Sequence, residues 1–349
     1  MPAGESSEAN HAMLRHSSDA EPGITRKRMG RYWAYFDAEG SRVTDRGEID
    51  RLNAIGLPPA YENAWFCADS NGHLQATGID ARGRKQYRYH PEFRAKRDSA
   101  KYEGLLEFGK ALPKLRRRVE QDLKRRSLTR ETVLAAVVRL LDRQHIRVGN
   151  EEYAKENKSF GATTLRSRHI RRSGHDLLMR FTGKHGIVHE AKITDTNLKR
   201  ICRRCQELPG QMLFQYVNGD GEPKAITSGD VNEYIKQATG GDFTAKHFRT
   251  WSASVIALDQ LLKKAEHARI TMKTVIEPVA EALGNTPAIS RKSYVHPRLL
   301  EAIKDDARDP LGGMDRPNAR KRLSSAEVAL LDFLARNGRR SRRRAAAAA

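Results

Sequence analysis

The chain has 349 residues, which predicts two domains, and 38% of them are hydrophobic, enough for folded cores. Its 64 lysines and arginines outnumber 43 acidic residues, which leaves a net charge of +21. This excess favours a polyanionic partner, with nucleic acid ahead of a membrane surface, although a solvated basic surface is the alternative. No apolar run could span a bilayer and no secretory signal is present, so we expect a cytoplasmic protein.

The cysteines are Cys67, Cys202 and Cys205. The pair in "ICRRCQEL" has the spacing of a zinc site, but no second pair exists to complete four ligands. We therefore expect reduced, structural cysteines in a reducing compartment and no bound metal.

The first part of the chain predicts a leader and a small lobe. Residues 1–24 are polar and predict a disordered leader, followed by a β-rich domain over 25–95. Its expected strands are short aromatic or alternating segments separated by turn signals, at 31–37, 64–69, 72–80 and 85–90. A short helix is expected at 47–56.

Helical periodicity dominates the rest, and predicts a mainly helical domain over 96–335. A hairpin with a tight "KHG" turn interrupts the helices at 176–193. Thr129 and Thr286 are predicted N-caps, and Gly284 a C-terminal cap. Residues 336–349 predict a disordered basic tail. The expected helices cover 100–124 (as one or two), 129–145, 228–239, 244–264, 271–283, 286–295 and 324–338.

Five residues along this domain suit phosphodiester transfer without a metal. Arginines can hold the two non-bridging oxygens, a nucleophile must attack in line, and an acid must protonate the leaving oxygen. No "GxxxxGK[ST]" loop and no acidic metal-binding cluster is found, so we expect no cofactor. Each residue alone reads as an ordinary surface or packed residue; the combination is informative. The candidates are Arg147, Lys184, Arg249, Asn285 and Tyr294.

In this order the five residues resemble the type IB DNA topoisomerases, in particular the small poxvirus-like enzymes found in bacteria. The resemblance is carried by "RVGNEEY…SFGATTL", "FTGK" and "TPAISRKSYVHP", and by "NGHLQATGIDARGRKQYRYHPEFRAKRD" upstream, and it runs from about residue 30 to 305. It implies an α+β fold, with a small β-rich N-terminal lobe and a larger, mainly helical catalytic lobe that together form a clamp around duplex DNA.

The resemblance also implies a role for each residue. Tyr294 would attack the DNA phosphate and form a 3′-phosphotyrosyl bond, while Arg147 and Arg249 hold the non-bridging oxygens. Lys184 would protonate the departing 5′-oxygen. Asn285 stands where many relatives carry histidine; its amide can donate a hydrogen bond but cannot titrate. Relaxation would need neither ATP nor metal.

Further residues are expected to bind DNA. At strand spacing, Tyr87 and Tyr89 share one face and Gln86 lies opposite, where it is placed to read a base edge while the tyrosines contact backbone or stack. The alternative is a strand with a half-buried aromatic face. Lys246, which begins "KHFR", is the remaining expected DNA contact.

Two other functions compete with this interpretation. A tyrosine recombinase shares the catalytic logic, but its usual motif is HxxR, whereas this triplet begins with lysine. A non-enzymatic basic DNA-packaging protein would need the charge but not the ordered residues, and would form no covalent adduct. We expect a nucleoid-associated monomer that binds no nucleotide.

Overall fold

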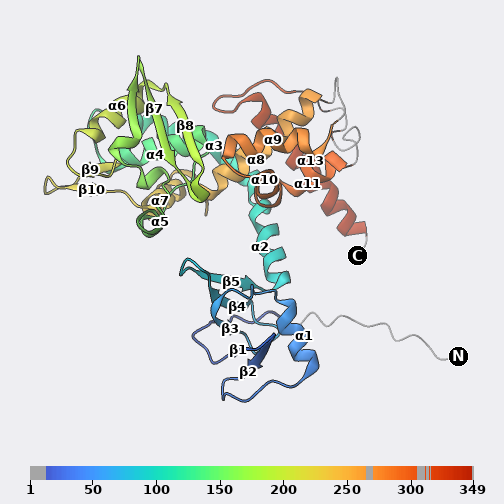
Figure 1. The fold of residues 1–349 in the computed structure, drawn as a ribbon. Helices are drawn as coiled ribbons and strands as arrows, with labels where there is room; N and C mark the ends of the chain where they lie inside the picture. The colour runs from blue at the N-terminus through green and yellow to red at the C-terminus, as the bar shows by residue number, and fades with distance from the viewer. Residues whose placement is uncertain (1–12, 265–269, 305–310, 312–313, 315, 348–349) are drawn as a thin grey trace. The chain divides into compact units, whose positions relative to one another are not determined.

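The computed structural model describes residues 13–264, 270–304, 311, 314 and 316–347, and the chain divides into two compact units (Figure 1). Unit 1 ends at Glu103 and unit 2 begins at Gly104. The sequence placed this boundary at residue 96, within what is now helix α2 (Pro91–Glu103). No helix in the described part of the chain is both long and apolar enough to cross a bilayer.

In the described part of unit 1, an antiparallel five-stranded sheet has the order β2-β1-β3-β4-β5. Helix α1 (Arg46–Ala54) begins at Asp45, whose carboxylate accepts a hydrogen bond from the Glu48 backbone N–H. A small core of Phe66, Leu52 and their neighbours fixes the helix on the sheet. The strands are β1 (Ile24–Met29), β2 (Tyr32–Phe36), β3 (Glu62–Phe66), β4 (Leu74–Ile79) and β5 (Lys85–Tyr89).

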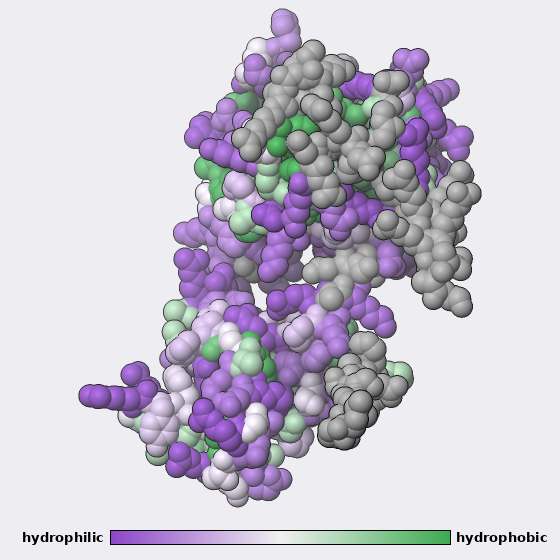
Figure 2. Space-filling view, turned by 90° about the vertical axis from the view of Figure 1, so that its right-hand side faces the viewer, coloured by the Kyte–Doolittle hydropathy of each residue, from purple (hydrophilic) through white to green (hydrophobic). Residues whose placement is uncertain are grey.

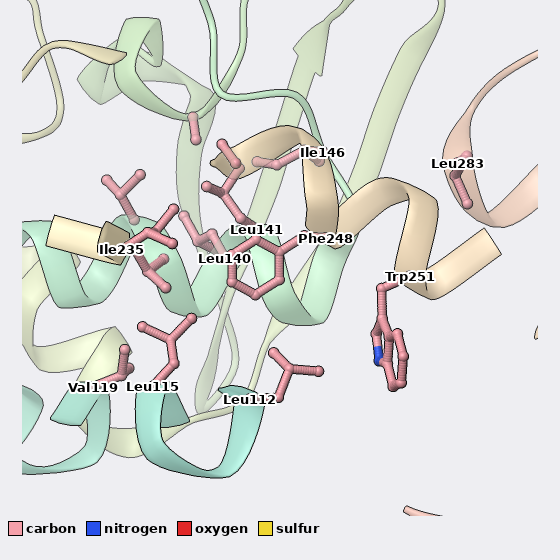
Figure 3. Close-up of a cluster of buried hydrophobic side chains, with 14 of the residues drawn as sticks. Leu112, Leu115, Val119, Leu140, Leu141, Ile146, Ile235, Phe248, Trp251 and Leu283 are labelled. Atoms are coloured by element: carbon pink, nitrogen blue, oxygen red, sulfur yellow. The ribbon is translucent and has the colours of Figure 1, made fainter. Parts of the chain in front are cut away.

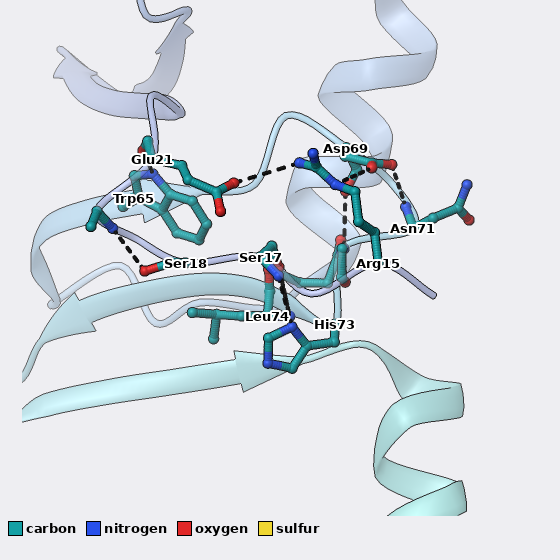
Figure 4. A network of polar contacts seen from close by, with 12 residues as sticks. Arg15, Ser17, Ser18, Glu21, Trp65, Asp69, Asn71, His73 and Leu74 are labelled. Carbon is teal, nitrogen blue, oxygen red and sulfur yellow. Dashed lines mark hydrogen bonds and ion pairs between the residues drawn. The ribbon is translucent and has the colours of Figure 1, made fainter. Parts of the chain in front are cut away.

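The predicted disordered leader is wrong for residues 13–24, while residues 1–12 lie outside the described part (Figure 4). Ser17 is only 2% exposed, and its hydroxyl donates to the Leu74 carbonyl at 3.1 Å. Its backbone N–H donates to His73 Nδ1 at 3.0 Å. Polar side chains and backbone groups hold this segment, so hydrophobic periodicity could not reveal it.

Unit 2 is mainly helical. Its strands form a sheet in the order β6-β7-β8 and a separate β9–β10 hairpin among the described residues. The strands are β6 (Ile170–Ser173), β7 (Asp176–Thr182), β8 (Val188–Ile193), β9 (Gln215–Val217) and β10 (Pro223–Ala225). The helices are α3 (Leu105–Lys124), α4 (Arg130–Gln144), α5 (Glu151–Asn157), α6 (Thr196–Gln206), α7 (Ser228–Thr239), α8 (Ala245–Lys264), α9 (Met272–Leu283), α10 (Pro287–Ser293), α11 (Pro297–Lys304) and α13 (Ser325–Ala347).

The core of unit 2 is built around α4, which is buried on nearly all sides (Figure 3). Leu140 and Leu141 of this helix meet Phe248 of α8 and Leu112 of α3 within the same cluster. The predicted caps are confirmed: Thr129 and Thr286 accept hydrogen bonds from backbone N–H groups of their helices, and Gly284 ends α9 at φ +57°. Gly284 and Thr286 thus fix the junction of α9 and α10 on either side of Asn285, whereas Thr129 caps the end of α4 opposite to Arg147.

Three other sequence expectations are resolved. The stretch 100–124 forms two helices, since α2 and α3 are separated at Gly104. Helix α10 ends at Ser293, so Tyr294 caps its C-terminus instead of lying inside the helix. A disordered tail was expected from residue 336, whereas α13 continues to Ala347, which fits the high helix propensity of arginine and alanine; residues 348–349 lie outside the described part.

Gly109 of α3 makes room for the Trp251 indole. A Cβ atom at this position would lie 2.2 Å from Trp251 Cη2, and Trp251 is only 2% exposed. We expect Gly109→Ala to cost the upper part of the about 1–3 kcal/mol typical of overpacking. This exceeds the roughly 1 kcal/mol that alanine gains in a helix, so urea unfolding of unit 2 should show a lower free energy of unfolding. The control is Gly104→Ala, because a Cβ atom at Gly104 would have no other atom within 4 Å. A Gly109→Ala protein as stable as wild type would contradict the packing argument.

Candidate active site

Arg249 is the most buried of the candidate residues, at 4% exposed on helix α8. Its Nη1 donates to the carbonyl of His145, and its Nη2 donates to the carbonyl of Leu283 at 3.0 Å. These two carbonyls lie at the C-terminal ends of α4 and α9. Arg249 therefore joins three helices, and the partial negative charge at the C-termini of α4 and α9 stabilises its buried positive charge.

Arg147 lies in the loop that follows α4, and its position depends on a distant segment. The carbonyl of Arg147 accepts a hydrogen bond from Ala162 N–H at 2.8 Å, and that of Val148 accepts one from Thr163 N–H at 2.7 Å. Close approach requires glycine at Gly161, where a Cβ would lie 2.6 Å from the Arg147 oxygen. The "RVGN" and "SFGATT" segments are thus joined by backbone hydrogen bonds, which fix the position of Arg147.

Asn285 connects to this loop from the end of α9. Arg147 Nη2 donates to Asn285 Oδ1 at 2.8 Å, which orients the amide. The Asn285 Nδ2 atom is buried and has no hydrogen-bond partner among the described residues, and the same is true of Arg249 Nε. Buried donors are nearly always satisfied in folded proteins. Two such donors in one site therefore indicate a missing acceptor, as a phosphate oxygen would be.

Tyr294 packs directly against this pair of arginines. The guanidinium carbon of Arg249 lies 4.9 Å from the centroid of its ring. Burial alone would raise the pKa of the phenol, but the charges of Arg249 and Arg147 and their hydrogen bonds outweigh it, so the pKa of Tyr294 is lowered. Burial, followed by the charge of Arg147, lowers the pKa of Arg249 to about 10. The two arginines therefore make the phenol a stronger acid than its burial alone would allow.

Lys184 lies at the exposed turn between β7 and β8, as predicted. It lines a cavity of about 380 Å³ together with Arg147, Arg249 and Tyr294. Lys246, predicted as a DNA contact, lines the same cavity from the first turn of α8. The structure thus brings the predicted catalytic residues together, with Asn285 joined to them through Arg147.

His189 of β8 is a residue of this site that the sequence analysis missed. A Cβ at Gly183 would lie 2.6 Å from its ring, and a Cβ at Gly284 would lie 2.5 Å from it. The imidazole also stacks on Phe181, with ring centroids 5.1 Å apart. His189 therefore fills the space between the hairpin that carries Lys184 and the turn before Asn285. In the sequence, the only indication of a role for His189 was its position on the inward face of an alternating strand.

The predicted DNA contacts of unit 1 lie on β5. Tyr87 and Tyr89 share one face, as strand spacing predicted, and their rings stack with centroids 6.2 Å apart. Tyr87 is 44% exposed. The Gln86 amide instead donates to Asp80 Oδ2 at 3.0 Å. Tyr87 is thus exposed and Tyr89 half-buried, while one donor of Gln86 is already engaged within unit 1.

The cysteines are free, as expected, and all three are buried, with Cys202 and Cys205 on α6. Burial raises the pKa of the Cys205 thiol to about 12, so it is held as a neutral thiol. Within the described residues, no group of three or more histidines, cysteines, aspartates or glutamates could hold a metal ion. The charged residues in the described lining of the active-site cavity are arginines and lysines.

Comparisons with known proteins identify the family of the chain. The family model described as the catalytic core of eukaryotic DNA topoisomerase I matches residues 90–310, and the model of the N-terminal domain of bacterial DNA topoisomerase IB matches residues 32–80. DNA topoisomerase 1B of Acanthamoeba polyphaga mimivirus is 31% identical over 296 residues, covering 81% of this chain and 88% of that protein. DNA topoisomerase 1B of vaccinia virus (strain Copenhagen) is 24% identical over 250 residues, and the match covers 70% of this chain and 76% of the viral protein. The chain therefore belongs to the type IB DNA topoisomerase family.

Proposed function

We propose that this chain relaxes supercoiled duplex DNA by nicking and resealing one strand, with Tyr294 as the nucleophile. The observation that carries the proposal is the half-buried Tyr294 phenol, which packs against Arg249, has its pKa lowered by the charges of Arg249 and Arg147, and lines one cavity with both arginines and Lys184. A phosphate placed there would meet the attacking oxygen, charge-assisted donors and an acid within one site.

The reaction divides into two transesterifications. The Tyr294 Oη–phosphorus bond forms as the phosphorus–O5′ bond breaks, which leaves a 3′-phosphotyrosyl bond and a 5′-hydroxyl. The lowered pKa of Tyr294 eases loss of the phenolic proton to water, and Lys184 supplies a proton to the 5′-oxygen. Resealing is the reverse, in which the 5′-hydroxyl attacks and Tyr294 leaves. Since the phosphotyrosyl bond retains the energy of the broken bond, no ATP is required.

Several finer assignments are part of the same proposal. The match to the bacterial N-terminal domain supports a place among the small poxvirus-like enzymes of bacteria. Figure 2 shows a largely hydrophilic face, which suits a highly charged polymer such as duplex DNA. We propose that the enzyme acts as a monomer without nucleotide or metal, with Lys246, Tyr87, Tyr89 and Gln86 among its DNA contacts.

The nucleophile is tested by Tyr294→Phe, which removes only the attacking oxygen. We expect no plasmid relaxation in EDTA without nucleotide, no denaturant-resistant protein–DNA adduct, and duplex binding close to wild type. The matched control is Tyr216→Phe, which removes a phenolic oxygen from β9 elsewhere in unit 2. Adduct formation by the Tyr294→Phe protein would assign the nucleophile to another residue.

The acid is tested by Lys184→Ala, which should slow single-turnover cleavage by roughly 10²–10⁴-fold. Sulfur at the 5′-bridging position makes a leaving group that scarcely needs a proton. The variant should therefore cleave that substrate nearly as fast as wild type does. An equal defect on the oxygen and sulfur substrates would exclude Lys184 as the acid.

The donor role of Asn285 is tested by Asn285→Asp, which keeps an oxygen for Arg147 but replaces the unpartnered Nδ2 donor with an acceptor. Removal of one preorganised donor costs about 10²–10³-fold in rate, so cleavage should fall by at least this factor. Asn285→His should recover much of the activity because imidazole can donate. If the residue only shapes the turn after Gly284, Asn285→Gly would cleave at near the wild-type rate, which would refute the donor role.

A further inference from the structure

A second cavity of about 470 Å³ lies in unit 2 and is not part of the candidate active site. Residues of α3, α4, α8 and α13 and of the segment before α13 line it. One part of its wall is apolar and includes Trp251, Val255 and Leu323. Its volume lies in the range of small-molecule binding sites.

The charges of this cavity are unbalanced. Five arginines and three carboxylates line it. Asp142 and Glu327 both pair with Arg116, each at 2.7 Å, and Glu120 pairs with Arg322 at 2.8 Å. All the carboxylates in the described lining are thus paired with Arg116 or Arg322. Arg139, Arg143 and Arg320 have no carboxylate partner within this lining.

The remaining arginines have few partners. Arg139 is 8% exposed and its Nε makes no hydrogen bond; its ion pair with Asp195 is loose, at 3.8 Å. Arg143 and Arg320 are exposed, and neither side chain has an ion pair or hydrogen bond within the part of the chain that the structure describes. The buried Nε–H of Arg139 is thus available to donate to an anionic oxygen, beyond its loose ion pair with Asp195.

His145 contributes a further buried polar group. Its Nδ1 is buried without a hydrogen-bond partner among the described residues. Burial lowers the pKa of its imidazole, so the ring is neutral at pH 7. The same residue accepts a hydrogen bond from Arg249 through its backbone carbonyl. His145 therefore lines this cavity and also contacts Arg249 of the candidate active site through its backbone carbonyl.

We propose that this cavity is a binding site for a small phosphate-bearing anion with a flat apolar body, of the size of a nucleoside monophosphate. Arg139, Arg143 and Arg320 bind the phosphate group, and the body packs on the half-buried side chains of Val255 and Ile256, close to the buried Trp251. Occupancy moves His145 and so changes the position of Arg249, which couples the site to strand cleavage. The binding site stands without the proposed catalytic roles, whereas the coupling rests on them.

The test uses the full-length chain carrying Trp33→Phe and Trp65→Phe, in which Trp251 is the remaining one of the three tryptophans. Adenosine 5′-monophosphate should change its fluorescence saturably, and inorganic phosphate should compete. Adding Arg143→Ala and Arg320→Ala should weaken binding by at least about tenfold, the value of one lost charge-assisted hydrogen bond. Adding Arg171→Ala and Arg172→Ala instead, which removes two exposed charges from β6, should leave it unchanged.

Two further arms separate the alternatives. Arg147→Ala, in the candidate active site, should leave the nucleotide signal intact; loss of the signal would place the ligand there and overturn the proposal. No saturable signal, or one insensitive to Arg143 and Arg320, would also overturn it. If only duplex DNA gave the arginine-dependent signal, the cavity would hold a backbone phosphate and not a free ligand. If the two sites are coupled, saturating nucleotide should change the single-turnover cleavage rate of the wild-type protein. The same nucleotide should have no effect on the rate of the Arg143→Ala/Arg320→Ala protein. An unchanged wild-type rate would refute the coupling but not the binding site.

Discussion

The buried charge of Arg249 is the constraint on which the active site depends. A cation at 4% exposure is costly unless acceptors surround it, and here the acceptors are backbone carbonyls at the ends of α4 and α9. The three helices must therefore meet at this point for the charge to be tolerated. Since Arg147 follows α4 and Asn285 follows α9, satisfying one arginine also brings both residues to it.

The positive charges of the active-site cavity are not balanced by acidic side chains in its described lining. The described lining of the active-site cavity contains arginines and lysines but no carboxylate. The charge of Arg147 adds to burial in lowering the pKa of Arg249, so the two cations destabilise each other. A phosphate would relieve this repulsion and satisfy Arg249 Nε and Asn285 Nδ2. Folding thus supplies a preorganised field, which is the largest contribution in many enzymes that stabilise anionic transition states.

Glycines set the distances within this site as much as the charged residues do. Gly161 lets one backbone segment approach the Arg147 carbonyl, while Gly183 and Gly284 leave room for the His189 ring. The hairpin of Lys184 and the turn of Asn285 therefore rest on one imidazole. Because protein interiors are closely packed, a larger residue at Gly183 or Gly284 would collide with the His189 ring and displace the hairpin or the turn.

The sequence by itself predicted the longer helices and the candidate residues of the site. Helical period predicted α4, α8 and α9, and their caps at Thr129, Gly284 and Thr286 could be read because capping uses short polar side chains or glycine at fixed local positions. The order of Arg147, Lys184, Arg249, Asn285 and Tyr294 was likewise visible along the chain.

Only the tertiary structure decided what depends on contacts between distant segments. Ser17 is held by backbone groups more than fifty residues away, so a polar segment read as disordered proved to be folded. The engagement of Gln86 by Asp80, the place of His189 between two glycines and the surplus of arginine around His145 are also invisible in sequence. Local pattern records how a residue suits its own helix or strand, whereas the partner that satisfies a buried charge or fills a gap is set by the packing of the whole unit.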